Sequence, residues 1–402
     1  QDVDGEPVLF DPRSAEFHAD PWHVYRRLRR EAPVYWQPQH RFWSLSRFDD
    51  VRDALFDWET YSNQGGVVIG EGSFFKPFLL ILDPPDHTRL RRLMVDILTP
   101  KRFLALEPVV REQAVTLLKE NVHDGAIDLA KDFAARLPMC IIGRLLGVPP
   151  EMDGQFIEWG HTIGNIDEAD GAASGRRAVE AIREIYDWYD RCFDERMAQL
   201  PVDDVIGRIV ELEKAGELTR DEAIGMGFLI TIAGSETTTR LVGNTLALLE
   251  AHPSQKAELL ADPSLIPGAL EETLRYDSPT YLETRTLKRD VTLRGQAMSA
   301  GDQVALLFNA ANHDDAQFDD AATFDIHRTL KPTDHLAFGG GVHACIGVQL
   351  ARMEGRVAME EILRRLGSYT LDMGNARHTF STNQRGWLSL PARGGELLET
   401  AQ

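Results

Sequence analysis

The sequence has little cysteine, three residues among 402, and it contains no long uninterrupted apolar run. Three cysteines are too few for a disulfide framework, so we expect a reducing compartment and a cytoplasmic protein. The longest apolar stretches, residues 78–82 and 226–234, fall short of the roughly 18 residues that span a bilayer, which predicts no stable membrane insertion. No signal-peptide pattern is present at the start. The chain begins at Gln1 without a methionine, so removal of an upstream segment stays an open alternative.

Positive charge is also scarce, because 43 Lys and Arg residues face 63 Asp and Glu residues and give a formal net charge of −20. Such a surface repels phosphate backbones and anionic lipids, which predicts that nucleic acid is not a partner. One local exception is a basic cluster within a short stretch, formed by Arg89, Arg91, Arg92, Lys101 and Arg102. The alternative for such a cluster is an ordinary solvated helix face.

What is present is the composition of an ordinary globular protein, with 43% hydrophobic and 26% charged residues. No linker or repeat divides the chain, so we expect a single domain over residues 1–402. Apolar spacing predicts helices at residues 21–31, over much of 87–252, at 265–276 and at 346–366. Strands are expected at residues 34–37 and 42–46 and within 283–308. Residues 61–82 and 314–335 are expected to be irregular and residues 165–175 a mobile loop, so the predicted class is mainly α with small β-sheets.

One long helix is predicted to begin at the capping box of Thr219 and Glu222 and to continue to about Ala251. At about 1.5 Å per residue it is about 48 Å long, which is enough to cross the domain. Its apolar middle carries the sequence Ala-Gly-Ser-Glu-Thr at residues 233–237. The Thr237 hydroxyl is able to bond the carbonyl at position 233 and loosen the helix, and Glu236 beside it is able to feed protons to a bound ligand. The alternative is a polar patch with a satisfied threonine.

The most informative segment is residues 338–347, Phe-Gly-Gly-Gly-Val-His-Ala-Cys-Ile-Gly. It places Cys345 at or just before the start of the helix expected at 346–366. Free N–H groups and the helix dipole favour a thiolate there, which is a metal ligand or a nucleophile. The surrounding glycines let the backbone pass close to something large and flat. The alternative is a structural cysteine after a glycine turn.

This segment resembles the haem-binding loop of the cytochrome P-450 family, Phe-Gly-x-Gly-x-His-x-Cys-x-Gly, at every fixed position. The resemblance implies the cytochrome P-450 fold, with haem b (protoporphyrin IX iron) between the long central helix and the cysteine-loop helix. It makes Cys345 the axial ligand of the haem iron, with Phe338, Gly339 and His343 against the haem. Residues 233–237 resemble the acid–alcohol pair of the family, which implies that Glu236 and Thr237 guide protons to iron-bound O2.

Two further motifs resemble those of the family. Glu272 and Arg275 match its Glu-x-x-Arg motif, with Arg328 as the arginine that completes a structural network below the haem. Residues 83–92 resemble its propionate-binding helix. There His87 and Arg91, at i and i+4, project from one face, and Arg285 and His343 complete the set. Without the haem loop, these residues have ordinary explanations. Glu272 and Arg275 would be a weak i, i+3 ion pair, and residues 83–92 would hold a helix-start histidine and solvated arginines.

The resemblance implies a bacterial haem-thiolate monooxygenase that inserts one atom of O2 into a C–H or C=C bond of a lipophilic small molecule. Its electrons are expected from a separate ferredoxin and ferredoxin reductase, with the cluster near Arg92 and Arg102 as the docking site. Substrate-pocket candidates are Phe74, Phe75, Phe78, Phe228, Ala233, Tyr281 and Leu282, although an aromatic cluster is often plain core. Two alternatives remain, a peroxide-driven peroxygenase on the same fold and a non-catalytic haem- or gas-binding protein.

Overall fold

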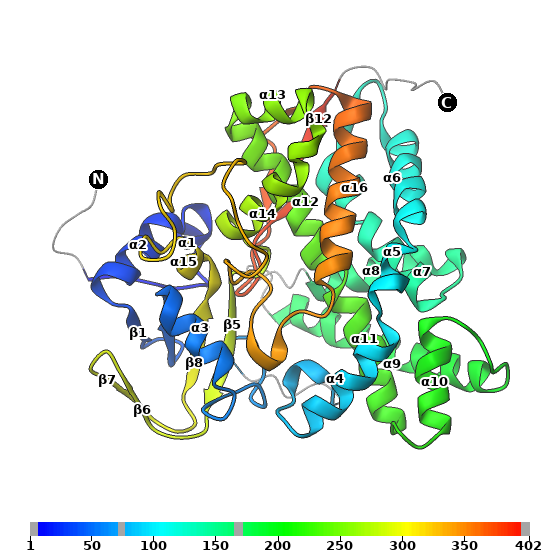
Figure 1. The fold of residues 1–402 in the computed structure, drawn as a ribbon, viewed down its shortest axis with the longest axis horizontal. Coiled ribbons are helices and arrows are strands. Elements are labelled where there is room, and N and C mark those ends of the chain that lie inside the picture. The colour runs from blue at the N-terminus through cyan, green and yellow to red at the C-terminus, as the bar shows by residue number, and fades with distance from the viewer. Residues whose placement is uncertain (1–6, 71–76, 165–171, 395–402) are drawn as a thin grey trace.

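A computed structural model describes residues 7–70, 77–164 and 172–394 of the chain (Figure 1). Its elements are mainly α-helices with a few small sheets, which confirms the predicted class. In Figure 1 the largest sheet lies on one side with the N-terminal helices, and the longer helices fill the other side.

The largest sheet has five strands in the order β1-β2-β8-β5-β3. They are β1 (Val34–Gln37), β2 (Phe42–Leu45), β3 (Tyr61–Ser62), β5 (Leu282–Leu287) and β8 (Gln303–Leu307). The β2–β8 pair is parallel, and the other pairs of this sheet are antiparallel. Side chains alternate along β8, so Val304 and Leu306 enter one core cluster while Ala305 and Leu307 enter another. The sheet is therefore covered on both faces.

The smaller sheets are a three-stranded one and two hairpins. The first has the order β4-β12-β9, from β4 (Ala126–Asp128), β12 (Pro391–Arg393) and β9 (Thr370–Leu371). The hairpins are β6 (Val291–Leu293) with β7 (Gln296–Met298), and β10 (Arg377–His378) with β11 (Trp387–Ser389). The β10–β11 hairpin lies against the helices, because β11 contacts α12.

Most helices pack around one large apolar cluster that extends in sequence from Leu79 to Ala392, and the helices beside the sheet pack into two smaller clusters. Those nearest the sheet are α1 (Ala15–Ala19), α2 (Trp22–Glu31), α3 (Phe48–Phe56) and α15 (Phe308–Asn312). The others are α4 (Asp86–Ile97), α5 (Pro100–Leu104), α6 (Glu107–Asn121), α7 (Leu137–Leu146), α8 (Asp153–Gly164), α9 (Ala172–Met197), α10 (Val205–Lys214), α11 (Arg220–Ala233), α12 (Glu236–Ala251), α13 (Pro253–Ala261), α14 (Ile266–Tyr276) and α16 (Val348–Leu366). None of the helices in the described ranges has the length and apolarity needed to cross a membrane.

The predicted long helix is interrupted. Its capping box is present as expected, with Thr219 and Glu222 bonding each other's backbone, but α11 ends at Ala233 and α12 begins at Glu236. The Ser235 hydroxyl donates to the Thr231 carbonyl at 3.1 Å. The Thr237 hydroxyl donates to the Ala233 carbonyl at 3.0 Å, as the sequence predicted. These side chains compete with the backbone for carbonyls, which explains the break.

Other expected boundaries shift slightly. The helix after the cysteine begins at Val348 rather than Ile346, and residues 314–335 contain no helix or strand, as expected. Of the loop expected at residues 165–175, residues 165–171 lie outside the described residues. Residues 172–175 belong to α9 and not to a loop. The irregular stretch at 61–82 contains β3 and a short 3-10 helix, Leu79–Ile81.

Candidate active site

The cysteine loop is a closed turn that leads into α16. The Cys345 N–H donates to the Phe338 carbonyl at 3.0 Å, and a 3-10 turn, Gly341–His343, lies between them. Gly339 (φ 66°) and Gly341 (φ 61°) adopt left-handed backbone that disfavours other residues. A Cβ on Gly341 would lie 2.4 Å from the Leu55 carbonyl oxygen. The close approach that Gly341 itself allows is therefore to the end of α3.

The Cys345 thiol keeps accessible surface although protein atoms surround it on all sides, so it faces an interior space. Burial raises its pKa, while the Gly347 N–H and the Arg91 charge act in the opposite direction. The N–H at the start of the helix favours the thiolate as expected, but burial has the larger and opposite effect on the pKa. A bound metal cation would supply the missing stabilisation, since a coordinating thiol is deprotonated.

The buried His87 and the partly buried His343 meet at this loop. The rings of His87, on α4, and His343 have centroids 4.2 Å apart. Both nitrogens of His87 and Nε2 of His343 are buried without a hydrogen-bond partner in the structure. Burial, helped by Arg91, lowers the pKa of His87 to about 4, and burial, helped by His87 and Arg285, lowers that of His343 to about 3. Unpaired buried nitrogens are costly, so this site is built for a polar group that the chain itself does not provide.

Two arginines border the same histidines. Arg91 is half-buried, and its Nη2 donates to the Ala344 carbonyl at 2.6 Å. Arg285 is 2% exposed on β5, and its Nη2 lies 3.2 Å from Oε2 of Glu283. The four residues assigned to the haem propionates thus come together, and orphan nitrogens beside two cations fit a pair of carboxylates. Sequence reasoning missed Glu283, although its i, i+2 spacing from Arg285 on a strand places both on one face.

The acid–alcohol pair lies at the break between α11 and α12. Ala233 is exposed and Thr237 half-exposed within an otherwise buried stretch, so both border open space. Glu236 is buried, and its Oε2 accepts from Arg240 Nη2 at 3.0 Å. Burial raises the pKa of Glu236, and the charges of Arg240 and His161 oppose the rise. Arg240 was missed, although the i, i+4 spacing of opposite charges was a usable signal.

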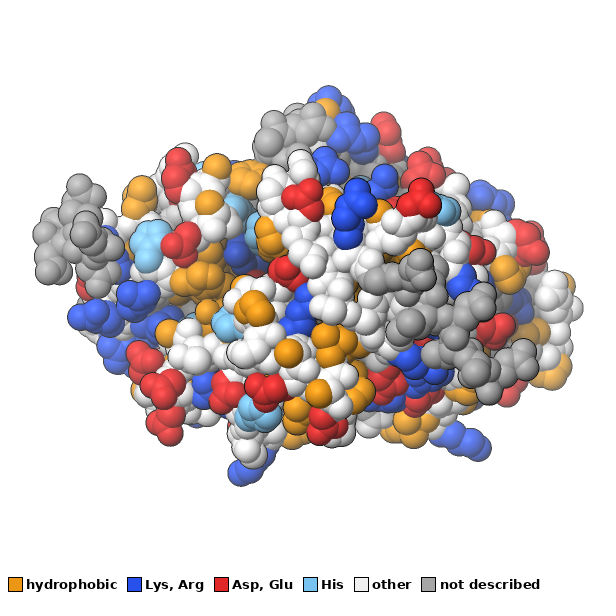
Figure 2. All heavy atoms as spheres, turned by 90° about the horizontal axis from the view of Figure 1, so that it is seen from above, with side chains coloured by type: hydrophobic (Ala, Val, Ile, Leu, Met, Phe, Trp, Pro, Cys, Tyr) orange, Lys and Arg blue, Asp and Glu red, His pale blue; other side chains and the backbone are white. Residues whose placement is uncertain are grey.

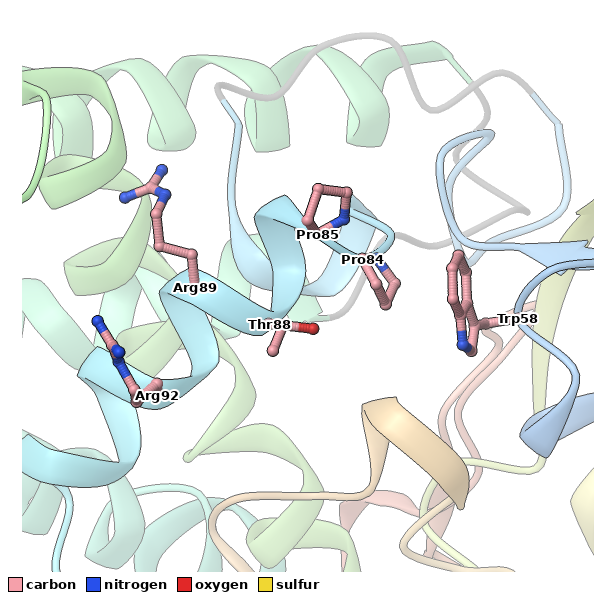
Figure 3. A pocket seen from close by; sticks show the side chains of 6 residues that line it. All are labelled: Trp58, Pro84, Pro85, Thr88, Arg89 and Arg92. Atoms are coloured by element: carbon pink, nitrogen blue, oxygen red, sulfur yellow. The ribbon is translucent and has the colours of Figure 1, made fainter.

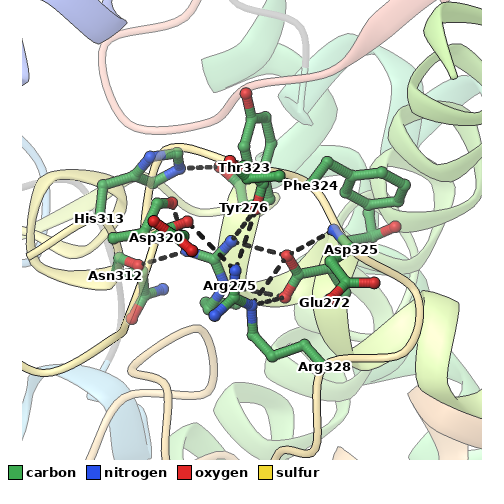
Figure 4. A network of polar contacts seen from close by, with 12 residues as sticks. Glu272, Arg275, Tyr276, Asn312, His313, Asp320, Thr323, Phe324, Asp325 and Arg328 are labelled. Carbon is green, nitrogen blue, oxygen red and sulfur yellow. Dashed lines mark hydrogen bonds and ion pairs between the residues drawn. The ribbon is translucent and has the colours of Figure 1, made fainter. Parts of the chain in front are cut away.

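The Glu272–Arg275 pair is fully buried and bidentate (Figure 4). Arg275 Nη2 and Nε lie 2.7 and 2.8 Å from the two carboxylate oxygens of Glu272. Arg275 Nη1 also donates to the Asn312 carbonyl at 2.9 Å, and Arg328 Nε lies 3.2 Å from Glu272. A charge-assisted bidentate pair is rigid. The network therefore fixes the irregular segment 312–328 against α14, as the sequence predicted for these three motif residues.

A second ion pair, which sequence reasoning missed, holds the start of the cysteine loop. Arg352, on α16, lies with Nε 2.5 Å and Nη2 2.8 Å from the carboxylate of Glu271. Although burial opposes it, bonding by His335 and Arg352 lowers the pKa of Glu271 to about 2. The Arg352 guanidinium also lies 4.9 Å from the centre of the Phe338 ring. The pair thus connects α14, α16 and the cysteine loop.

The substrate-pocket candidates have mixed placements. Phe74 and Phe75 lie outside the described residues. The Phe78 and Phe228 rings pack edge to face with centroids 5.9 Å apart within the core. Tyr281 and Leu282 are 1% and 0% exposed in a separate core cluster, so they border no open space. Among the candidates that the structure describes, Ala233 alone is exposed.

Several known proteins are similar to this chain. The family model described as "Cytochrome P-450" matches residues 260–396. A Mycobacterium tuberculosis protein designated cytochrome P-450 123 is 36% identical over 395 residues, which are 96% of this chain and 97% of that protein. The chain belongs to the cytochrome P-450 family. The Bacillus subtilis cytochrome P-450 PksS is 33% identical over 379 residues, 90% of this chain and 92% of its own. The structure of the cytochrome P-450 CYP109Q5 from Chondromyces apiculatus superposes with a TM-score of 0.87 at 32% identity, covering 97% and 99% of the two chains.

Membership establishes the enzyme class predicted from the sequence, a haem monooxygenase that uses O2. The residues present fit the cofactor that this cytochrome P-450 class requires. The Cys345 sulfur faces an interior space. The nitrogens of His87 and His343 that lack hydrogen-bond partners lie beside Arg91 and Arg285. A bound haem would meet both features, with Cys345 holding its iron and the histidines and arginines holding its carboxylates.

Proposed function

We propose that this cytochrome P-450 oxygenates a lipophilic small molecule with electrons from a separate ferredoxin and its reductase. The overall reaction consumes the substrate, O2, two electrons and two protons, and it releases the oxygenated product and water. The observation that carries the proposal is the accessible Cys345 sulfur beside two histidines, His87 and His343, whose buried nitrogens have no partner in the structure. That combination is costly unless an anionic, metal-bearing cofactor completes it.

Each part of the site has a role in this proposal. Cys345 holds the iron of haem b. His87, Arg91, Arg285 and His343 hold its carboxylates, and Phe338 and Gly339 shape the loop around the sulfur. When bound, haem supplies O2 activation, which the thiolate ligand promotes. Thr237 orients hydrogen bonds at the break in the helix, and Glu236 holds the proton to be delivered. Glu272, Arg275 and Arg328 keep the segment below the site rigid.

The substrate class is argued from the site and from relatives. Ala233 is an exposed apolar residue beside Thr237, and an apolar lining with few polar anchors selects lipophilic ligands. The name of the Bacillus subtilis relative places that protein in polyketide biosynthesis. A Bacillus megaterium structure, 31% identical to this chain, is a complex with testosterone. Polyketides and steroids are therefore the first compounds to screen.

The proposed electron-donor site is a surface cleft of about 570 Å³ (Figure 3). Trp58, Thr88, Arg89 and Arg92 are among the side chains that line it. Arg89 is paired with Glu222, and Arg102 lies 3.1 Å from Asp203, so both charges are partly neutralised. Arg92 is exposed and has no hydrogen-bond or ion-pair partner among the described residues, and its neighbour Arg91 touches the cysteine loop. Arg92 is therefore the cation we assign to an acidic ferredoxin.

Two broader features support the same proposal. All three cysteines are free thiols, as expected of a protein working in a reducing compartment such as the cytoplasm. The apolar cluster that extends from Leu79 to Ala392 joins early and late parts of the chain, which favours one domain. A peroxygenase would have no need of Glu236 and Thr237, because peroxide already carries the protons and electrons.

The deciding experiment replaces Cys345 by Ser in the purified holoprotein. The reduced, carbon monoxide-treated wild type should show the red-shifted Soret band of a thiolate adduct, and Cys345→Ser should lose it. Cys140→Ser, at a buried cysteine away from the loop, is the matched control and should keep the band. Persistence of the band in Cys345→Ser would exclude this ligand. Product formation with ferredoxin and reductase, against product formation with peroxide, separates a monooxygenase from a peroxygenase, and no product with either indicates a haem binder.

A further inference from the structure

Arg240 is a buried cation that joins three segments of the chain. It lies one turn after Glu236 on α12 and is 1% exposed. Its Nη2 donates to Glu236 Oε2 at 3.0 Å and to the Gly164 carbonyl at 2.8 Å. Its Nε donates to Gln384 Oε1 at 2.8 Å, and its Nη1 donates to the Thr379 hydroxyl. A buried charge is tolerated only when it is paired and hydrogen-bonded, and every nitrogen of this guanidinium meets that condition.

The same contacts fix the Glu236 side chain. Gly164 is the last residue of α8, and a Cβ there would lie 2.2 Å from Cγ and 2.8 Å from Oε2 of Glu236. The carboxylate is therefore clamped between a helix end that has no side chain and the guanidinium of Arg240. Among the described residues, His161, one turn earlier on α8, also acts on the pKa of Glu236. The position of this carboxylate thus depends on groups outside the helix that carries it.

The third segment reaches the start of β5. The Tyr281 N–H donates to the Asn383 carbonyl at 3.0 Å, and its hydroxyl donates to the Ser381 carbonyl at 3.2 Å. Gln384, which follows directly, accepts from Arg240. A continuous set of hydrogen bonds therefore connects β5, residues 381–384, Arg240 and the carboxylate of Glu236.

We propose that Arg240 is a positioning residue that fixes the carboxylate of Glu236 by joining it to residues 379–384 and to the end of α8. This inference rests on the proposed function, in which Glu236 holds the proton delivered to oxygen. Arg240 itself touches neither substrate nor oxygen. Its removal frees the carboxylate, and more of the O2 consumed then appears as peroxide instead of product.

The test is a double-mutant cycle on the holoenzyme with its electron donors. Arg240→Gln and Glu236→Gln should each lower the product formed per O2 consumed by about tenfold, as expected when a proton donor is misplaced or lost. The double variant should be no worse than Glu236→Gln alone, because Arg240 acts only through Glu236. An unchanged yield in Arg240→Gln, or a further loss in the double variant, overturns the proposal. Arg385→Lys alters the same segment at an arginine paired with Asp277, and it should keep the wild-type yield. A loss equal to that of Arg240→Gln would instead assign the effect to the segment.

A second pair of variants keeps the arginine. Gly164→Ala introduces a Cβ into the carboxylate of Glu236, whereas Gly154→Ala, on the same helix, meets nothing within 4 Å. Gly164→Ala should lower the yield and Gly154→Ala should not, and equal yields contradict the clamp. Both variants should retain the carbon monoxide band, which shows that haem is bound.

A readout without turnover separates this proposal from the proposed function. Infrared difference spectra of the resting protein, assigned by subtraction of Glu236→Gln, should show the Glu236 carboxyl stretch shift in Arg240→Gln and Gly164→Ala but not in Gly154→Ala. Absence of any shift overturns the positioning role even if the enzyme is active. A wild type that forms no product with reductase or with peroxide overturns the proposed function, while the infrared result still decides the role of Arg240.

Discussion

At the residue scale, an ionisable group that is buried without a partner makes the stability of the protein depend on pH. Glu354, on α16, is fully buried, and neither carboxylate oxygen has a hydrogen-bond partner in the structure. Burial alone raises its pKa well above the ordinary value. The folded state therefore keeps this carboxyl protonated at pH values where the unfolded chain ionises it.

The stability of Glu354→Gln relative to wild type should depend on pH. Because the folded pKa is raised, the wild type has its full stability below the unfolded pKa of about 4.5 and loses it as pH rises, by up to ~1.4 kcal/mol per pH unit. Glutamine mimics the neutral acid, so the variant should match the wild type near pH 4 and become increasingly more stable above it. Denaturant unfolding of the holoprotein at several pH values measures this difference.

A control with the opposite sign is available on the same helix. Glu361 is buried, and although burial opposes it, bonding from Arg364, Arg111 and Arg365 lowers its pKa. Its contribution is present above the unfolded pKa and is lost as pH falls, so Glu361→Gln should be less stable than the wild type near neutral pH. Parallel pH profiles for the two variants would refute both assignments.

At the element scale, features that depend on local spacing were predicted from the sequence, and features that depend on distant neighbours were not. The capping box of Thr219 and the Thr237 bond to the Ala233 carbonyl were both predicted, because each involves residues within one helical turn. The break at Gly234 and Ser235 was missed, although Thr237 was expected to loosen the helix at this point. A Cβ on Gly234 would lie 2.4 Å from Cδ1 of Ile142, a contact from another helix that the sequence does not reveal.

The cysteine loop offers a prediction at this scale. Gly341→Ala forces a left-handed residue and places a Cβ 2.4 Å from a backbone oxygen that cannot move aside. We expect the free energy of unfolding to fall by roughly 2–4 kcal/mol. About 1–2 kcal/mol of this comes from the left-handed backbone, and the steric clash adds the rest. Denaturant unfolding, together with the fraction of protein that retains haem, measures the effect.

Gly295→Ala separates the two causes. Gly295 also has positive φ (79°), but a Cβ there meets nothing within 4 Å, and it lies on the β6–β7 hairpin away from the site. Gly295→Ala should lower the free energy of unfolding by only about 1–2 kcal/mol, which is the backbone contribution, and should leave the haem content unchanged. Equal losses in both variants would show that contact with α3 plays no part at Gly341.

At the scale of the whole molecule, net charge and local charge differ. The chain carries a formal charge of −20, yet on the face seen in Figure 2 acidic and basic side chains are interspersed. An acidic partner is repelled by the net charge at long range and attracted only where unpaired cations gather. Screening reduces both effects beyond about 8–10 Å at physiological salt, so the local cations decide where docking occurs.

Arg92→Glu should therefore lower ferredoxin-driven turnover by about tenfold at low salt, with a smaller effect as salt is raised, because the lost interaction is electrostatic. Peroxide-driven turnover should not change. Arg377→Glu makes the same change in net charge at an exposed site on β10 and should leave both rates at wild-type values. If the two variants behave alike, the cleft beside Trp58 is not the docking site.

The sequence by itself determined the family and the residues that match its motifs, because these depend on residue types at short, fixed spacings. Only the tertiary structure decided what surrounds them. It showed that burial outweighs the helix end at Cys345, that Gly341 makes room for α3, and that Arg240 clamps Glu236. The physical reason is that pKa values, steric limits and ion pairs are set by groups that are distant in sequence, and no local pattern records which of them the fold brings into contact.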